Sequence, residues 1–236
     1  MDAILTGQIL AIPDLNPERI AEMFSLFSVY YHGTSLGIFQ RDLGKKNWVI
    51  LLFDTQEGKL RGFTTFEIYT RSYQGSDLTV VYSGDTVVEK EYRGNFDLPR
   101  IWIHSILDVC VGMPRPIYWL LISSGYKTYR FLPLFYKQFY PRSGVTTPED
   151  TQQMIDFLAN DRFGTEYDPR QGIVQFHTGA TPLRQGVAEI TARHLQDPNI
   201  VFFVQRNPGH SVGDELVCLT EIDPRNFTDL GALMAS

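Results

Sequence analysis

Two spacings of apolar residues alternate along the first 142 residues of the chain. Runs rich in β-branched and aromatic residues predict strands, and apolar residues three or four positions apart predict helices. The predicted strands cover residues 4–12, 48–54, 60–70, 78–88 and 117–122, and the predicted helices cover residues 17–31, 35–43 and 98–111. A strand, two helices and three antiparallel strands, the last of which begins a strand–helix–strand unit, predict an α+β fold. It has a central, mostly antiparallel sheet, one parallel strand pair and helices on both faces.

The composition changes at residue 143, where a connection rich in threonine, proline and aspartate begins. We therefore divide the chain into a first domain, residues 1–142, and a C-terminal α/β extension, residues 143–236, packed on it. The pattern leaves open whether the extension completes the same sheet. Within it we predict a helix ending near residue 160, a strand at 173–177, a helix at 185–195 and strands at 200–205 and 215–222.

The stretch from residue 77 to residue 112 is a predicted strand, a sharp turn and a buried helix. Free N–H groups and the helix dipole at such a helix start can bind a phosphate. Arg93 is the best phosphate ligand by position, and the backbone N–H groups of Gly94 and Asn95 would contact the same anion. The alternative is a solvated arginine in a structural turn.

Asp85 interrupts the apolar pattern of the strand before that turn. Gly84 beside it predicts a bulge or a close backbone approach. A carboxylate at a bulge facing a cleft can act as a general base on an amine, whereas the structural alternative is local hydrogen bonding. Later in the chain, His210 and Glu215 lie in a polar loop that suits either ligand binding or a plain hairpin.

The overall composition narrows the classes of function. A net charge of -6 argues against electrostatic binding to nucleic acid. The two cysteines lie in apolar runs and the histidines are scattered, so we expect a reducing compartment and no metal site. The N-terminus lacks the pattern of a signal peptide, and the apolar runs are too short to span a bilayer. We therefore expect a cytoplasmic protein.

Two motifs and the order of elements resemble the superfamily of Gcn5-related N-acetyltransferases (GNAT). The motifs are VVEKEYRGNFDL, from Val87, and LFYKQFYPR, from Leu134. The resemblance implies that the first motif holds the pyrophosphate of coenzyme A. It also implies that the central strand splays from its parallel neighbour and offers backbone groups of Val87 and Val88 to the pantetheine arm. Phe96 and Leu98 stand where the family has two further glycines, which predicts an altered pyrophosphate loop.

The resemblance further implies an acyltransferase that moves an acyl group to the amine of a small molecule or peptide by direct transfer in a ternary complex. The donor would be acyl-CoA or the thioester of an acyl carrier protein, and no metal would take part. Tyr136 aligns with the family's tyrosine that protonates the departing thiolate, although simple packing would also explain it. Asp85 would accept the proton of the amine. The alternatives are a GNAT-like ligand- or peptide-binding module without catalysis, and a synthase that makes a small signalling molecule.

Overall fold

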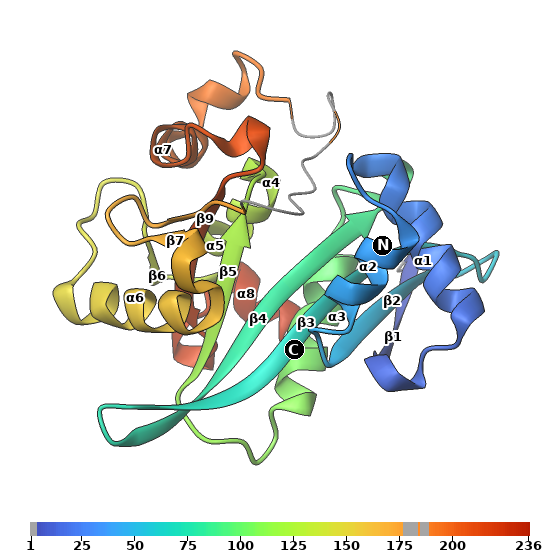
Figure 1. Ribbon diagram of the computed structural model, residues 1–236, viewed down its shortest axis with the longest axis horizontal. Helices are drawn as coiled ribbons and strands as arrows, with labels where there is room; N and C mark the ends of the chain where they lie inside the picture. The colour runs from blue at the N-terminus through green and yellow to red at the C-terminus, as the bar shows by residue number, and fades with distance from the viewer. Residues whose placement is uncertain (1–3, 177–183, 185–188) are drawn as a thin grey trace.

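The strands form one twisted sheet, which is shown in Figure 1. The computed structural model describes residues 4–176, 184 and 189–236. Within these residues the strand order is β1-β2-β3-β4-β5-β9-β8-β7, with β6 paired to β9. The strands are β1 (Leu5–Ala11), β2 (Trp48–Asp54), β3 (Leu60–Tyr73), β4 (Ser76–Val88), β5 (Ile117–Ser123), β6 (Phe139–Tyr140), β7 (Tyr167–Asp168), β8 (Ile173–Val174) and β9 (Glu215–Glu221).

The predicted fold class is confirmed by the strand pairing. Strands β1 to β4 are antiparallel neighbours, β4 and β5 are parallel, and β5 is antiparallel to β9. Because β9 lies beside β5, the last part of the chain contributes strands to the same sheet as the first part.

Helices cover both faces of the sheet (Figure 1). In the view of Figure 1, α1, α2 and α6 lie in front of the sheet, and α3, α5 and α8 lie behind it. We call these the front face and the α3 face. The helices are α1 (Pro17–Tyr30), α2 (Leu36–Leu43), α3 (Asp97–Val109), α4 (Tyr126–Tyr129), α5 (Phe131–Phe135), α6 (Glu149–Phe163), α7 (Pro198–Arg206) and α8 (Asp229–Met234).

Alternation along the strands divides the core between the two faces. On β5, Trp119 and Leu121 pack in the cluster on the α3 face, whereas Leu120 packs in the cluster under α6. On β3, Phe63 packs in a third cluster, under α1 and α2. None of the helices in the described part of the chain is both long and apolar enough to cross a membrane.

One predicted strand is wrong, because residues 200–205 belong to helix α7. Asp197 caps this helix by accepting a hydrogen bond from the Asn199 N–H group, and Pro198 occupies its first turn. These start signals decide the structure of a short apolar run that also has the composition of a strand. The predicted helix at 185–195 lies partly outside the described residues, and so does the end of the predicted strand at 173–177. The described part of the predicted helix includes a 3-10 turn at His194–Gln196, and the described part of the predicted strand includes β8.

Candidate active site

The parallel strands β4 and β5 separate before either of them ends. Their pairing runs from Thr79 opposite Ile117 to Tyr82 opposite Leu120. Beyond this point β4 continues to Val88 and β5 to Ser123 without further pairing between them. A cleft of about 1160 Å³ opens there and is lined from both faces of the sheet. The splayed strand pair implied by the resemblance is therefore present.

The predicted bulge lies in β4 where the strand enters the opening. Phe66 on β3 pairs with Ser83, and Thr64 pairs with Thr86, so Gly84 and Asp85 together oppose a single residue. A Cβ atom on Gly84 would lie 2.5 Å from the Oγ1 of Thr65 and equally close to a lysine side chain. Only glycine fits this approach.

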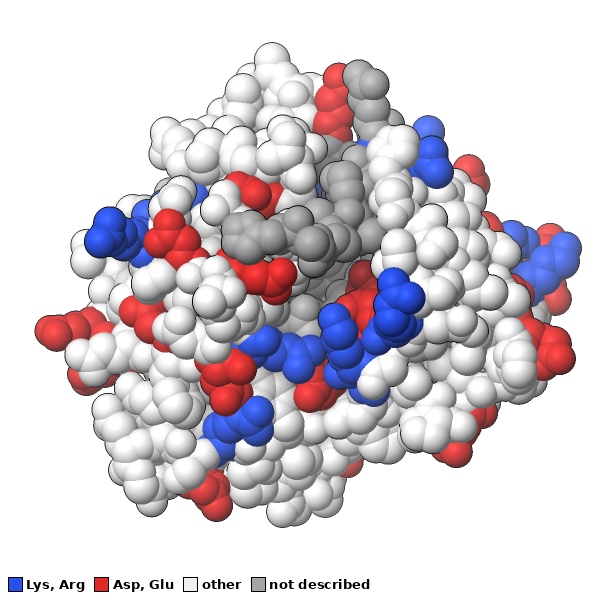
Figure 2. Space-filling model, in the orientation of Figure 1, with Lys and Arg blue, Asp and Glu red and all other residues white. Residues whose placement is uncertain are grey.

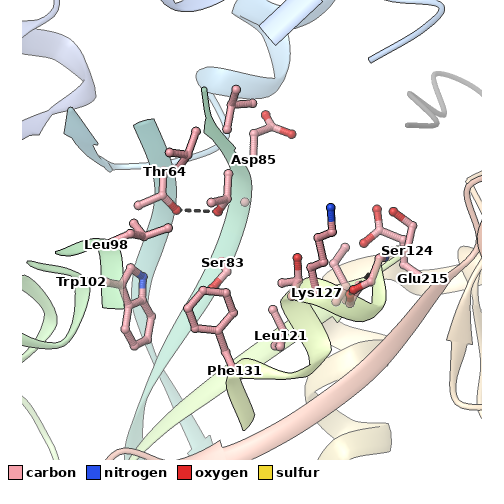
Figure 3. A pocket seen from close by; sticks show the side chains of 18 of the residues that line it. Thr64, Ser83, Asp85, Leu98, Trp102, Leu121, Ser124, Lys127, Phe131 and Glu215 are labelled. Carbon is pink, nitrogen blue, oxygen red and sulfur yellow. Dashed lines mark hydrogen bonds between the residues drawn. The ribbon is translucent and has the colours of Figure 1, made fainter. Parts of the chain in front are cut away.

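Three charged side chains, those of Asp42, Lys46 and Glu215, lie around Asp85 on the front face. Lys46 is 3% exposed, and its Nζ lies 2.7 Å from the Oδ2 of Asp42 on α2. Glu215, the first residue of β9, lines the same part of the cleft. Figure 3 shows Asp85 and Glu215 on opposite sides of the opening. On the face drawn in Figure 2, acidic and basic side chains gather side by side near the centre.

These neighbours separate the proton affinities of the carboxyl groups. Burial raises the pKa of Asp85 to about 6, and the charge of Asp42 adds to this while Lys46 opposes it. Burial, followed by the charges of Asp85 and Asp42, raises the pKa of Glu215 to about 8. Burial also acts on Asp42, but Lys46 outweighs it and lowers the pKa of that carboxyl group. Of the two carboxyl groups that face the opening, Asp85 therefore has the lower pKa and ionises before Glu215 as the pH rises.

On the α3 face the cleft wall is apolar and aromatic. The Nε1 of Trp119 donates a hydrogen bond to the Oγ of Ser83, across the point where the strands part. The Trp119 ring packs on that of Trp102, with centroids 4.4 Å apart. Figure 3 shows Trp102 and Ser83 together on this side. The remaining wall consists of Leu98, Ile103, Leu121, Phe131, Leu134, Phe135 and Tyr136.

Tyr136 lies in this wall with its hydroxyl group buried. The residue is 2% exposed, and its hydroxyl has no hydrogen-bond partner among the described residues. Its ring centroid lies 5.8 Å from that of Trp119. Burial raises the pKa of the hydroxyl far above its usual value, so it stays protonated and can donate.

The turn after β4 places a cation at the mouth of the cleft. The Nε of Arg93 donates to the Val88 carbonyl at 2.7 Å, and its guanidinium lies 4.4 Å from the centroid of the Tyr30 ring. Lys127 lies near enough for the charge of Arg93 to lower its pKa, in addition to the larger effect of burial. Gly94, with φ of +85°, makes the turn that leads into α3.

Backbone donors lie beside this cation at the start of α3. The side chain of Asn95 accepts from the Asp97 N–H group and donates to a carbonyl of the turn. In the described part of the chain, the N–H groups of Gly94, Asn95 and Phe96 donate to no protein acceptor. Phe96 is 51% exposed, so its ring is not packed into the core behind these groups.

The two valines of the first motif face different ways. The Glu89 N–H group bonds to the Arg61 carbonyl on β3, so by alternation the backbone of Val87 also faces β3. The backbone of Val88 then faces the opening, where its carbonyl accepts from Arg93. The structure thus brings Val88, Arg93, Gly94, Asn95, Asp85 and Tyr136 to one cleft, which Val87 also lines with its side chain buried toward α1.

Sequence reasoning did not assign Asp42, Lys46, Trp119 or Glu215 to the site. Asp42 and Lys46 are four residues apart at the end of α2, a spacing that signals an ion pair but not its position. Glu215 reaches the cleft only because β9 is inserted beside β5. The described residues contain no group of three His, Cys, Asp or Glu side chains able to hold a metal ion.

No protein-family model and no curated protein matches the sequence. The fold is similar to solved structures that include GNAT enzymes. A GNAT family N-acetyltransferase (YhbS) from Escherichia coli, in complex with CoA, is 20% identical over 56% of this chain and 70% of that one, with a TM-score of 0.38. NAA60 from Arabidopsis thaliana, in complex with a bisubstrate analogue, is 17% identical over 62% and 92% of the two chains, with a TM-score of 0.39.

A third similar structure is a conserved protein of unknown function from Enterococcus faecalis V583, described as a probable N-acyltransferase. It is 15% identical over 66% of this chain, with a TM-score of 0.42. The match spans only 43% of that protein's length. All three similarities are distant, so the functional assignment depends on the chemistry of the cleft.

Proposed function

We propose that the protein is an acyltransferase that moves an acyl group from a coenzyme A thioester to an amine within the cleft between β4 and β5. The observation that carries this proposal is the chemical difference between the two sides of one continuous opening. The α3 face is apolar and begins at a cluster of anion-binding groups, whereas the front face carries carboxylates.

The donor fits the α3 face. Arg93 and the N–H groups at the start of α3 would hold the pyrophosphate, because both the cation and the helix dipole favour an anion there. The pantetheine arm would lie along the unpaired edge of β4, where the Val88 backbone faces the opening. The Val88 carbonyl already accepts from Arg93, so at this residue the edge offers the arm its N–H group.

The acceptor fits the front face. An amine is mostly protonated at neutral pH, and a carboxylate both attracts it and accepts its proton. Asp85 is the group suited to this step, because its pKa of about 6 leaves it ionised at pH 7. This favours a small-molecule or peptide amine as the acceptor.

The transfer is a direct displacement. The amine nitrogen attacks the thioester carbonyl carbon, the C–N bond forms, and the C–S bond then breaks. A backbone N–H group of β4 that faces the opening would stabilise the oxyanion. Asp85 receives one proton from the ammonium form of the amine before the attack and passes it to solvent. It then receives the second proton from the nitrogen of the tetrahedral intermediate, and the hydroxyl of Tyr136 gives its proton to the leaving thiolate and regains one from solvent.

A donor titration tests this proposal. We expect acetyl-CoA to raise the melting temperature of the wild-type protein, since a ligand that binds only the folded state stabilises it. Arg93→Ala should weaken acetyl-CoA binding by about 10- to 100-fold, as expected for one charge-assisted contact. Binding of acetyl-pantetheine, which lacks the nucleotide, should be unchanged by this substitution.

The matched control is Lys90→Ala, which removes an exposed cation from the same turn. It should leave both titrations as they are. Stabilisation by acetyl-pantetheine but not by acetyl-CoA would instead favour an acyl carrier protein as the donor. If neither thioester stabilises the protein, the acyltransferase proposal fails and a binding module without catalysis is the better description.

A further inference from the structure

The side chain at the floor of the opening is Trp119. It lies on β5 directly before Leu120, which is the last residue paired with β4. Its Nε1 atom donates to the Oγ of Ser83, which is the first residue of β4 beyond that pairing. This hydrogen bond joins the two strands at the point where they separate, and a group entering the opening meets the indole there.

The indole of Trp119 is fixed in place. It is only 6% exposed, it packs on Trp102 at 4.4 Å between ring centroids, and it lies 5.8 Å from the Tyr136 ring. All four side chains of this arrangement, including Ser83, line the cleft. Because protein interiors are closely packed, a side chain held by a hydrogen bond and two aromatic contacts leaves no room to swing aside.

Tyr136 indicates which part of the donor lies against this floor. Its hydroxyl is buried and has no partner among the described residues, which is costly unless a ligand supplies one. In the proposed reaction that ligand atom is the thioester sulfur. The acyl group is bonded to the sulfur, so it lies next to the neighbour of Tyr136 in the wall, which is Trp119.

We propose that Trp119, held by Ser83, limits the length of the acyl group and makes the enzyme specific for short-chain donors such as acetyl-CoA. This inference rests on the proposed acyltransferase function. The floor of the opening cannot be displaced by a longer chain without breaking the Trp119–Ser83 hydrogen bond and the contact with Trp102.

Competition between acetyl-CoA and hexanoyl-CoA tests the inference. For each thioester we would measure the affinity by titration and, with an amine acceptor, the turnover. The wild-type protein should favour acetyl-CoA by about tenfold or more, since even single methylene groups can be discriminated to this degree. In the double variant Trp119→Leu with Ser83→Ala, which removes the indole and its partner together, the preference should shift toward hexanoyl-CoA by at least about tenfold.

Three further variants keep the test decisive. Trp48→Leu makes the same substitution on β2, outside the cleft lining, and should not change the preference. Ser83→Ala alone keeps the indole but removes its hydrogen bond, so it should shift the preference toward hexanoyl-CoA less than the double variant does. If the double variant does not fold, Trp119→Phe retains a ring and should give a smaller shift in the same direction.

The outcomes distinguish this inference from the proposed function. If wild type binds both thioesters equally, or if a folded Trp119 variant keeps the wild-type preference, the acyl group lies elsewhere and the inference is overturned. If wild type binds neither thioester, the acyltransferase proposal itself fails, and the inference fails with it.

Discussion

The two sides of the opening between β4 and β5 differ in how they are built. The α3 face consists of aromatic side chains packed on one another, and the Tyr136 hydroxyl among them has no partner in the described residues. The front face holds charged groups that perturb one another, with Asp85 and Glu215 competing for protons around the Asp42–Lys46 ion pair. Beyond its anion-binding start, one side is apolar and closely packed, and the other is charged and sensitive to pH.

This difference suits the two substrates of an acyl transfer. A thioester is uncharged at its reacting end and needs positioning and, later, one proton for its sulfur. An amine arrives charged and has to lose its proton before it can attack. Substitutions on the front face should therefore affect chemistry and pH dependence, whereas substitutions on the α3 face should affect donor selection and stability.

Asp85→Asn should cause the largest loss. The amide keeps the shape of the side chain but cannot accept the proton of the amine, so we expect kcat/KM to fall by about 10²–10⁴-fold. Donor binding, measured by titration with acetyl-CoA, should remain at the wild-type value because the donor lies on the other face. In the wild type, kcat/KM should rise with pH through an apparent pKa of about 6, as the carboxyl group ionises.

Asp77→Asn, near the start of the same strand and exposed, is the matched control and should leave the rate unchanged. If Asp85→Asn keeps the wild-type rate, the front face does not supply the base. If it weakens acetyl-CoA binding instead, the assignment of the donor to the α3 face and of the amine to the front face is wrong.

Tyr136→Phe should reduce the rate less than Asp85→Asn does, and it should stabilise the folded protein. A thiolate is already a good leaving group, so losing its proton donor should cost about 10²-fold in kcat or less. Removing a buried hydroxyl without a partner should also stabilise the free protein, by about 1 kcal/mol in urea unfolding.

Tyr129→Phe provides the comparison, because the Tyr129 hydroxyl donates to the Pro141 carbonyl at 3.1 Å. Its loss should destabilise the protein by about 1 kcal/mol and leave kcat unchanged. If Tyr136→Phe is destabilised to a similar degree, the Tyr136 hydroxyl has a hydrogen-bond partner in the free protein. It would then no longer indicate where the thioester sulfur binds.

Local sequence patterns predicted those features of the two faces that depend on residues adjacent in the sequence. Gly84 indicated the bulge that carries Asp85, and the run after Arg93 indicated the turn and the start of α3. The same patterns were wrong for residues 200–205, where a cap and a proline decide for a helix.

The front face could not be assembled from the sequence for a physical reason. Asp42, Asp85 and Glu215 come from distant segments, and Glu215 reaches the other two only because β9 pairs with β5. No local pattern reports that pairing, since a strand of this composition can join either edge of a sheet. Trp119 could not be assigned to the site for a similar reason. A tryptophan in an apolar strand has the pattern of an ordinary core residue, and only the structure shows its hydrogen bond to Ser83 on β4.

Glu215→Gln should have the smallest effect on the reaction rate, because Glu215 takes no part in the proposed proton transfers, and it tests the electrostatics of the front face through stability. The folded protein raises the pKa of Glu215 to about 8, so it holds a proton that the unfolded chain releases above a pKa of about 4. The folded state binds more protons in this window, so the stability contributed by this group is full below pH 4 and is lost as the pH rises toward 8. Glutamine does not titrate. In urea unfolding the variant should therefore match wild type near pH 4 and increasingly exceed it as the pH rises toward 8.5, by at most about 1.4 kcal/mol for each pH unit. Glu91→Gln, at an exposed position, should differ from wild type equally at both pH values. If the stabilities of Glu215→Gln and wild type change equally with pH, the fold does not raise the pKa of Glu215. The proposed electrostatic difference between the front face and the α3 face would then be wrong.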